Sequence, residues 1–227
     1  MEFSHPIVEL RQYTLHPGAF DTLARVFDEH FVESQERHGM QIIGQFRDLA
    51  DPDRFVWIRA FPDADARARA LEAFYSGPVW KEHGPAANAT MIDHTNVLLL
   101  RPAGPGRAFR FDPQRRPSAD AGVTPGGVVV ATISHLAVAA TAATTASLCM
   151  EGGPEAPLAC LVTEPDRKPF ARLPVREDAN VLVTFTSCAR ADAVRALAPA
   201  GSIVSRRERL LLEPTRRSFL RHRHEPP

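Results

Sequence analysis

The sequence has few of the residues that mark several classes of protein. It contains three cysteines and no CxxC pair, and only two of its 27 basic residues are lysine. Acidic residues also number 27, so the chain has no net charge with which to attract nucleic acid. An odd number of cysteines without metal-ligand spacing favours unpaired thiols in a reducing compartment. We therefore expect no nucleic-acid partner, no disulfide framework and no metal site.

Long apolar runs and a secretory leader are also missing. The first six residues contain neither the basic nor the apolar region of a signal peptide. The longest apolar candidate, residues 136–150, includes three threonines and a serine and is shorter than the roughly 20 residues needed to cross a bilayer. The sequence thus predicts a cytoplasmic protein that has no membrane partner.

What the chain does contain is typical of a globular protein. Apolar residues make up 44% and charged residues 24% of its 227 residues, enough for one large domain or two small ones. Proline and glycine punctuate residues 103–126, which we interpret as a linker. The linker separates a first domain, residues 1–102, from a second, residues 127–215. A basic tail over 216–227 follows, and we expect it to be solvated.

Apolar periodicity predicts the same order of elements in both halves. In the first half it predicts strands over 7–15, 41–49, 55–61 and 95–101, and helices over 17–38, 63–75 and a short piece from 78. In the second half it predicts strands over 128–138, 158–163, 181–186 and 208–212, and helices over 139–150 and 190–197. Each β-α-β-β-α-β unit forms a four-stranded antiparallel sheet with helices on one face. We expect an α+β fold in which two tandem ferredoxin-like units pack sheet to sheet as a pseudo-dimeric α/β barrel.

Strand parity selects the candidate site residues. We expect Val8 and Leu10 to face the helices, because the first helix carries an apolar stripe that they can pack against. The opposite face of that strand then points into the barrel and carries Glu9, Arg11 and Tyr13. The same alternation in the third strand places four further side chains inside: Phe55, Trp57, Arg59 and Phe61. Charged groups on such an enclosed face must pair or meet solvent.

Two interpretations of this inward set stay open. In one, a Glu9–Arg11 or Glu9–Arg59 ion pair only stabilises the barrel. In the other, the set forms a polar pocket in which Trp57 is the flat wall for an aromatic substrate and Tyr13 donates a hydrogen bond. Catalysis would then use Glu9 as a base, with Arg11 and Arg59 stabilising an oxyanion.

Two histidines and a tryptophan complete the candidate set. His38 lies 18 residues, or five helical turns, after Phe20, so we expect it to return to the buried stripe at the helix end. There it either caps the last carbonyls or acts as a general base at the barrel mouth. Trp80 and His83 lie one turn apart after Pro78. We expect Trp80 to pack over the barrel end, and both Trp80 and His83 are candidates for binding substrate.

The first half resembles the NIPSNAP family. The resemblance rests on an ordered set of segments: VELRQYTLHPG from residue 8, RHG from 37, IIGQF from 42, FYSGPVWK from 74 and LLLRP from 98. They cover about residues 6–102, and the second half has no match to E-x-R-x-Y or P-x-W-K. The resemblance implies the dimeric α/β barrel fold of antibiotic biosynthesis monooxygenases, which is shared with cofactor-free oxygenases, haem-degrading enzymes and small-molecule isomerases.

Residues and resemblance together predict a small-molecule tailoring enzyme of a specialised-metabolite pathway that needs no cofactor. Inside the barrel it would oxygenate an aromatic or polyketide-like substrate, or rearrange or cyclise it by proton transfer. The alternative is a non-catalytic small-molecule-binding or assembly module whose strand edges pair two chains into a homodimer. Haem binding through one inward histidine is a third hypothesis. A connected cavity lined by Arg11, Tyr13 and Trp57 favours the enzyme, whereas a filled interior favours the module.

Overall fold

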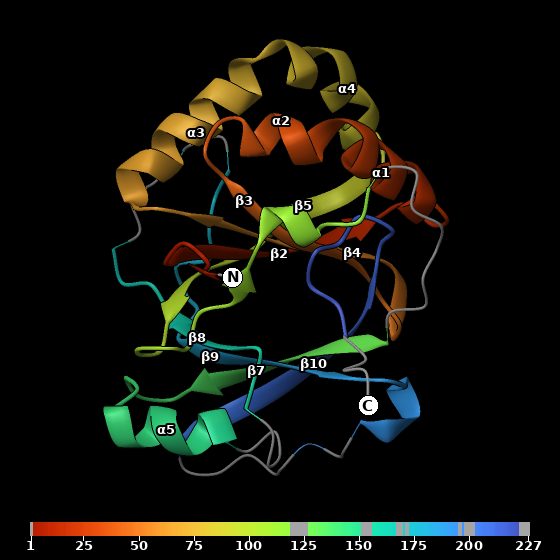
Figure 1. Ribbon diagram of the computed structural model, residues 1–227. Coiled ribbons are helices and arrows are strands. Elements are labelled where there is room, and N and C mark those ends of the chain that lie inside the picture. The colour runs from red at the N-terminus through yellow and green to blue at the C-terminus, as the bar shows by residue number, and fades with distance from the viewer. Residues whose placement is uncertain are drawn as a thin grey trace.

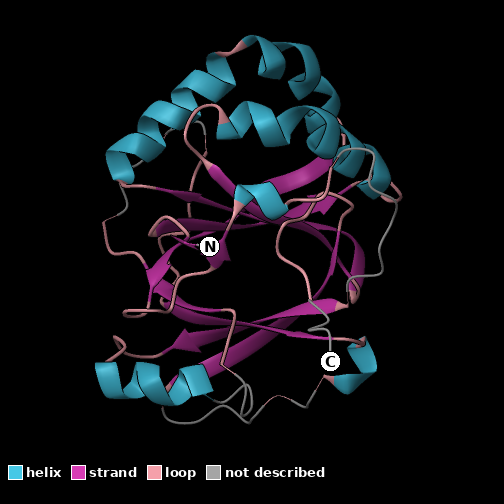
Figure 2. Ribbon diagram, viewed as in Figure 1, coloured by secondary structure: helices cyan, strands magenta, loops and turns pink. Residues whose placement is uncertain are grey.

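Two four-stranded sheets close into one barrel in the computed structural model of the protein (Figure 1). The structure describes residues 2–118, 127–150, 156–166, 170, 173–194, 197 and 203–222. In Figure 2 a thick layer of helices covers one side of the barrel, and a shorter helix covers the other side.

The first unit has the expected strands but a more divided first helix. Its strands are β2 (Ile7–Leu15), β3 (Gln41–Asp48), β4 (Asp51–Phe61) and β5 (Met91–Pro102). Its helices are α1 (Phe20–Val26), the π-helical turn η1 (Phe27–Phe31), α2 (Val32–Glu36), α3 (Ala64–Ser76) and α4 (Pro78–Asn88). Gly39 ends the first helical run with a φ of 82°, a conformation that glycine adopts without Cβ strain. Asp63 caps α3, because its Oδ1 accepts the backbone N–H of Ala66 at 2.7 Å.

The second unit repeats this order with fewer helices. Its strands are β7 (Val128–Leu136), β8 (Ala159–Thr163), β9 (Val181–Cys188) and β10 (Val204–Pro214), and its helix is α5 (Ala142–Met150). In the described part of the expected helix over 190–197, the only helical element is the 3-10 turn η3 (Ala191–Ala193). The last strand is longer than the expected 208–212.

Strand order shows that both units are ferredoxin-like. The barrel runs β10-β3-β4-β2-β5-β8-β9-β7, so in each unit the first strand lies between the third and the fourth. Antiparallel pairing of β10 with β3 and of β5 with β8 joins the two sheets at both edges. The prediction of a pseudo-dimeric α/β barrel built from two such units is therefore confirmed.

The barrel lumen is filled by apolar side chains from both units. One core cluster lies in the lumen and includes residues of four strands: Val8 and Leu10 of β2, Val129 and Ala131 of β7, Val183 and Phe185 of β9, and Leu210 and Leu212 of β10. A second cluster joins the helices to the other face of the first sheet, where Tyr13, Phe55, Trp57 and Phe61 lie. Among the described residues, these side chains occupy the space in which a substrate pocket was expected.

The parity predicted from the sequence is therefore wrong. Glu9, Arg11, Tyr13, Trp57 and Arg59 share the face of the sheet that lies under the helices, opposite to the face that carries Val8 and Leu10. Both faces of β2 are buried, so an apolar residue on it had two possible partners. Val8 and Leu10 pack against aliphatic side chains of the second sheet. These partners come from the second half of the chain, so the pattern of the first half alone could not reveal them. The catalytic site expected inside the barrel does not exist there.

The connecting segment and the tail are more ordered than the sequence predicts. Within the expected linker, β6 (Arg110–Phe111) pairs with β1 (Glu2–Phe3), a 3-10 turn η2 (Pro113–Arg115) follows, and Phe109 is fully buried in the lumen cluster. The expectation of a solvated tail is wrong for Arg217 to Leu220, which are all buried. Both segments extend the core, because Phe109, Phe111, Phe219 and Leu220 complete it.

The expectation of unpaired cysteines is also wrong. Cys149 of α5 and Cys160 of β8 form a disulfide with a Cα–Cα distance of 6.0 Å, and Cys188 is free. The pair joins a helix to a strand 11 residues away, a relation that spacing along the chain does not reveal. Among the described residues, no helix combines the length and the apolar character needed to cross a membrane.

We predict that Leu10→Ala lowers the free energy of unfolding by about 2–5 kcal/mol, because it opens a cavity in the filled lumen. The matched control is Leu49→Ala, in which the same change is made at a leucine that is 41% exposed. The control should stay within about 0.5 kcal/mol of the parent. Urea unfolding measures both variants. Equal effects of the two substitutions would contradict the lumen assignment.

Candidate functional site

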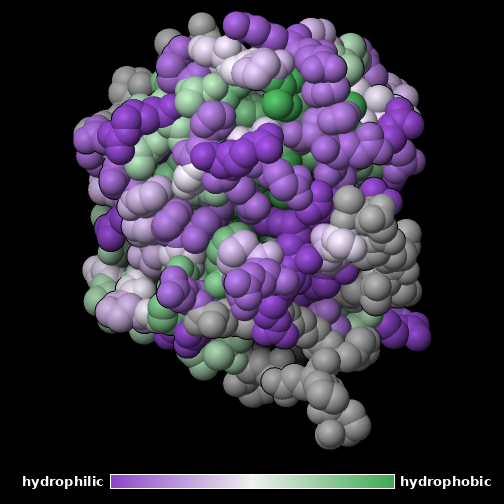
Figure 3. Space-filling view, turned by 45° about the horizontal axis from the view of Figure 1, so that its top comes forward, coloured by the Kyte–Doolittle hydropathy of each residue, from purple (hydrophilic) through white to green (hydrophobic). Residues whose placement is uncertain are grey.

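A cavity of about 530 Å³ lies between the outer face of the first sheet and the helices above it. Aromatic side chains from several elements form most of its wall: Tyr13, Phe27, Phe31, Trp57, Phe74, Tyr75 and Trp80. Figure 3 is turned so that the side of the helical layer comes forward, and the surface there is mostly hydrophilic with a few hydrophobic residues visible. The cavity thus offers an apolar, flat-walled space of the size that holds a small organic molecule.

A buried ionic cluster adjoins this cavity on the sheet. Glu9 is fully buried, and its Oε2 accepts hydrogen bonds from Arg11 at 2.7 Å and from Arg59 at 2.8 Å. Its Oε1 accepts a third, from Nε of Arg67 on α3, at 2.6 Å. One carboxylate therefore faces three buried guanidinium groups, and these four side chains carry an excess of positive charge.

This arrangement fixes the protonation of the carboxylate. Burial alone would raise the pKa of Glu9, but the charges of the three guanidiniums outweigh it and lower that pKa far below its usual range. Glu9 is consequently an ion with both oxygens engaged. The predicted role of Glu9 as a general base does not fit this site, because a general base works best with a pKa near the operating pH, and the pKa of Glu9 is lowered far below it.

Tyr13 links the ionic cluster to the cavity. Arg11 Nε donates a hydrogen bond to Tyr13 Oη at 2.8 Å, and Tyr13 lines the cavity. A guanidinium can only donate, so this bond uses a lone pair of the phenol oxygen and leaves its O–H to find another acceptor. The positive charge of Arg11 also makes that O–H a stronger donor.

Trp57 supplies a second donor. Its side chain is 2% exposed and lines the cavity, and its Nε1–H has no acceptor within the described part of the chain. The Arg59 guanidinium lies 4.7 Å and that of Arg11 5.5 Å from the indole centroid. A buried donor without an acceptor costs about 1–3 kcal/mol, so an acceptor atom on a bound ligand would be stabilised here.

Gln35 and Arg67 were not singled out by the sequence analysis. Gln35 Oε1 accepts from Arg59 at 2.9 Å, its Nε2 donates to the carbonyl of Phe31 at 3.1 Å, and its side chain lines the cavity. Arg67 contacts Glu9 from α3. The sequence held a signal for each. Gln35 is a polar residue on the same helical face as Phe27 and Phe31, and Arg67 is an arginine among the alanines of α3.

His38 lies outside this site. It is exposed in the turn after α2 and does not line the cavity, so the predicted roles as buried cap and as general base both fail. The count of five turns assumed a regular α-helix, whereas η1 closes its turn with an i→i+5 bond from Val32 N–H to the carbonyl of Phe27. The extra residue changes the helical phase, and the helix ends at Glu36.

Trp80 and His83, one turn apart on α4, make different contacts. Trp80 lines the cavity against Phe31 and Phe74, with ring centroids 5.4 and 5.7 Å away. His83 stacks on His30 of η1 with a centroid distance of 3.6 Å and is not part of the cavity wall. The structure therefore gives His83 a packing contact between η1 and α4 instead of the expected contact with substrate.

Two further residues line the cavity that are not among the predicted site residues. His94 of β5 lines the cavity with its ring edge-to-face to Tyr13, at a centroid distance of 6.2 Å. Leu173, from the segment between β8 and β9, is buried in the same wall, so the second half contributes to the cavity. Among the described residues, no group of three or more histidine, cysteine or acidic side chains could hold a metal ion.

Comparison with known proteins agrees with this architecture. Two putative monooxygenases, from Lactobacillus acidophilus and Fusobacterium nucleatum, match nearly the whole chain. The first is 12% identical and covers 92% of this chain and 94% of its own, with a TM-score of 0.55. The second is 10% identical and covers 94% of each chain, with a TM-score of 0.53. Identities this low show the fold alone.

The first half has more similar relatives. A NIPSNAP family protein of unknown function from Agrobacterium tumefaciens is 26% identical and covers 49% of this chain and 96% of its own, with a TM-score of 0.40. None of the curated proteins matches the chain. The NIPSNAP family model matches residues 8–105, the segment that contains β2 to β5 and all the helices over the cavity. The resemblance of the first half to the NIPSNAP family is therefore confirmed over these residues.

Proposed function

We propose that the protein binds a planar, largely apolar small molecule carrying an acidic oxygen, in the cavity between the first sheet and its helices. The observation that carries the proposal is the pair of donors at the ionic cluster: the O–H of Tyr13, polarised by Arg11, and the Nε1–H of Trp57, buried without an acceptor in the described structure. An oxyanion there would meet both donors and the excess positive charge behind them. The aromatic walls would hold the ring system.

The proposed chemistry follows from stabilising that oxyanion. Binding an enol or phenol as its anion lowers the pKa of the substrate and makes the ring electron-rich. Such an anion can react with O2: at a ring methylene, one oxygen atom becomes a carbonyl, the other leaves as water with the two hydrogens, and the substrate supplies all four electrons. Reprotonation at another carbon would instead give an isomer, and attack of the carbanion on a carbonyl carbon of the same molecule, whose oxygen takes up the electron pair and the proton, would give a cyclised product. We propose this class of tailoring reaction, which needs no separate redox cofactor.

A non-catalytic binding module is the second candidate. It is favoured by the engagement of Glu9 with three arginines, which leaves the cluster without a free base. O2 consumption with 1,8-dihydroxyanthrone, corrected for its oxidation in buffer, separates the two. The enzyme proposal expects uptake well above the buffer rate that is lost in Tyr13→Phe. Tight binding of this compound without any O2 uptake or conversion would leave the binding module.

The charge of the ligand gives the first prediction. We expect 2-naphthoate to bind at least about tenfold more tightly than its uncharged analogue 2-naphthamide, because only the anion offsets the excess positive charge of the cluster. Isothermal titration calorimetry measures both affinities. Both tryptophans of the chain line the cavity, so binding should also change the protein's fluorescence. Equal affinities for acid and amide would contradict the proposed ligand class.

The second prediction uses the two tyrosines of the chain as a matched pair. Both line the cavity, but within the described residues only Tyr13 accepts a hydrogen bond from an arginine. Tyr13→Phe should weaken binding of 2-naphthoate by about 10- to 100-fold, the effect of losing a hydrogen bond to a charged group. Tyr75→Phe should change the affinity less than about threefold. If the two substitutions have the same effect, Tyr13 does not have the proposed role.

The third prediction concerns Glu9. Glu9→Gln should lower the free energy of unfolding by about 3–5 kcal/mol, because it leaves three buried guanidiniums without their carboxylate. The pKa of Glu9 is lowered in the folded protein, so its contribution to stability is complete above the unfolded pKa of an ordinary glutamate and is lost as the pH falls below it.

Urea unfolding from pH 7 to pH 3 measures this contribution. The difference in stability between parent and Glu9→Gln should narrow as the pH falls below about 4.3. A difference that stays constant over this range would show that the carboxylate is not held by the arginines.

A further inference from the structure

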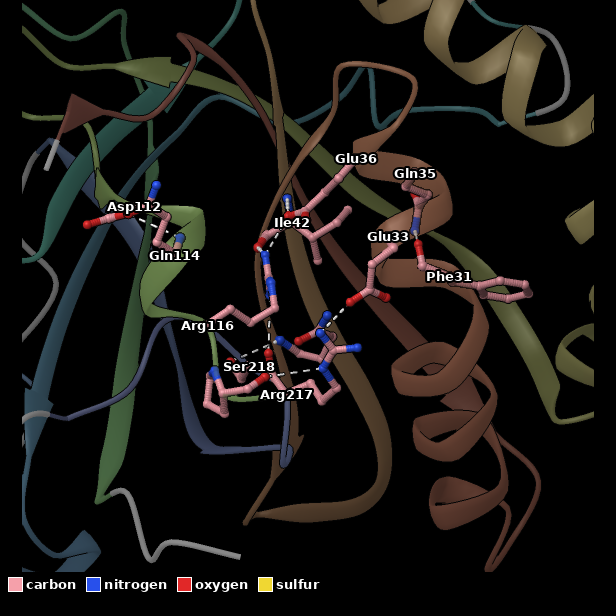
Figure 4. Close-up of polar contacts among 12 residues, drawn as sticks. Phe31, Glu33, Gln35, Glu36, Ile42, Asp112, Gln114, Arg116, Arg217 and Ser218 are labelled. Carbon is pink, nitrogen blue, oxygen red and sulfur yellow. Dashed lines mark hydrogen bonds and ion pairs between the residues drawn. The ribbon is translucent and has the colours of Figure 1, made fainter. Parts of the chain in front are cut away.

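Two arginines from distant parts of the chain hold the back of the helical segment that forms one wall of the cavity (Figure 4). Arg217 lies in the C-terminal segment after β10, and Arg116 lies in the segment that connects the two units. In Figure 4, Glu33 and Glu36 of the helical segment point toward these arginines, whereas the ring of Phe31 points away. Both arginines lie outside the segment that matches the NIPSNAP model.

Arg217 contacts the helical segment at two places. Its Nη2 forms an ion pair with Glu33, and its Nη1 donates to the backbone carbonyl of Asp28, within the π-helical turn η1, at 3.2 Å. Its Nε donates to the carbonyl of Pro117 at 3.3 Å. The residue is 7% exposed, so these contacts are made by a guanidinium that is largely shielded from water.

Arg116 extends this contact to the end of the helix. Its Nη2 lies 2.5 Å from Glu36 Oε1 and donates to the carbonyl of Ile42 at 2.6 Å. Its Nη1 donates to the carbonyl of Arg217 at 3.1 Å, so the two arginines are themselves connected. The side chain of Arg116 is only 5% exposed.

Backbone hydrogen bonds between the C-terminal segment and β3 hold Arg217 in place. The backbone N–H of Thr215 donates to the carbonyl of Gln45, and that of Leu220 donates to the carbonyl of Ile43, both at 2.8 Å. Ser218 Oγ accepts the backbone N–H of Gln45 at 3.2 Å. Arg217 therefore comes from a segment fixed on both sides by backbone hydrogen bonds.

The front of the same helical segment faces the ligand space. Phe27, Phe31 and Gln35 line the cavity, and Gln35 accepts a hydrogen bond from Arg59 of the ionic cluster. Glu33 and Glu36 lie on the opposite side, three residues apart on one helical face. The segment is thus held between the two arginines behind it and the ionic cluster in front. A π-helical turn is rare and is frequently found at functional sites.

We propose that Arg217 and Arg116 are positioning residues that set where Phe27, Phe31 and Gln35 stand in the cavity. This inference deepens the proposed function and rests on it for the ligand, although the positioning itself concerns the free protein as well. It means that the segments beyond the NIPSNAP domain, which no family motif identifies, tune the fit of the ligand in that domain.

The test compares Arg217→Gln with Arg221→Gln. Arg221 lies in the same segment and donates to the carbonyls of Thr215, Arg216 and Ser218. Arg217→Gln should weaken binding of 2-naphthoate by about tenfold, within the range for residues that act through a neighbour, whereas Arg221→Gln should not. Arg217→Lys keeps the positive charge but loses the planar guanidinium with its several N–H donors, and should give an intermediate affinity.

A readout without ligand separates positioning from simple stability. Acrylamide quenching of the two tryptophans and amide hydrogen exchange of residues 27–36 should both increase in Arg217→Gln and stay at the parent level in Arg221→Gln. If Arg217→Gln does not fold, Glu33→Gln removes the same ion pair from an exposed side chain and should show the same changes, more weakly.

Each outcome decides one question. Unchanged quenching and exchange in Arg217→Gln, or equal changes in both variants, would overturn the positioning role. If the parent protein does not bind 2-naphthoate, the proposed function fails, but quenching and exchange still test the positioning of the wall. Increased quenching and exchange together with unchanged affinity would show that the segment moves without affecting the ligand, which would also overturn the proposal.

Discussion

The Glu9 carboxylate, shared among three arginines under a layer of helices, is the interaction on which the rest of the site depends. Burying it with a single partner would be costly, and burying three guanidiniums without it more so. The cluster therefore needs neighbours that tolerate positive charge. Aromatic faces provide them: Trp57 lies beside two of the guanidiniums, and Tyr13 accepts a hydrogen bond from one. The aromatic cavity follows from the same requirement, and the Trp57 Nε1–H on its wall has no acceptor among the described residues.

In this barrel, the apolar core and the polar residues of the candidate site lie on opposite faces of the first sheet. Its lumen is a filled apolar core to which both units contribute, whereas the polar groups lie on the outer face of the first sheet. The two units share a strand order, and among the residues that the structure describes the ionic cluster lies on the first sheet alone. The second unit takes part indirectly: it closes the barrel, contributes Leu173 to the cavity and leads into the C-terminal segment that holds η1.

Much of this could be predicted from the sequence, and the failures have physical causes. Element order and the barrel followed from periodicity, and most of the site residues were found because Glu9, Arg11, Tyr13, Trp57 and Arg59 alternate with apolar residues. Which face they occupy could not be predicted, because both faces of a strand such as β2 are buried and parity alone does not choose between two apolar partners. His38 was misplaced by a π-helical turn that leaves no clear mark in the sequence. The contacts of Arg116 and Arg217 span more than 70 residues, beyond the reach of local patterns.

A crystal structure of the protein with 2-naphthoate would show directly where the ligand binds. We expect the naphthalene ring between Trp57, Phe31 and Trp80, with the carboxylate within hydrogen-bonding distance of Tyr13 Oη and Trp57 Nε1. A carboxylate directed toward the mouth at His94, or a ligand bound anywhere other than this cavity, would contradict this expectation.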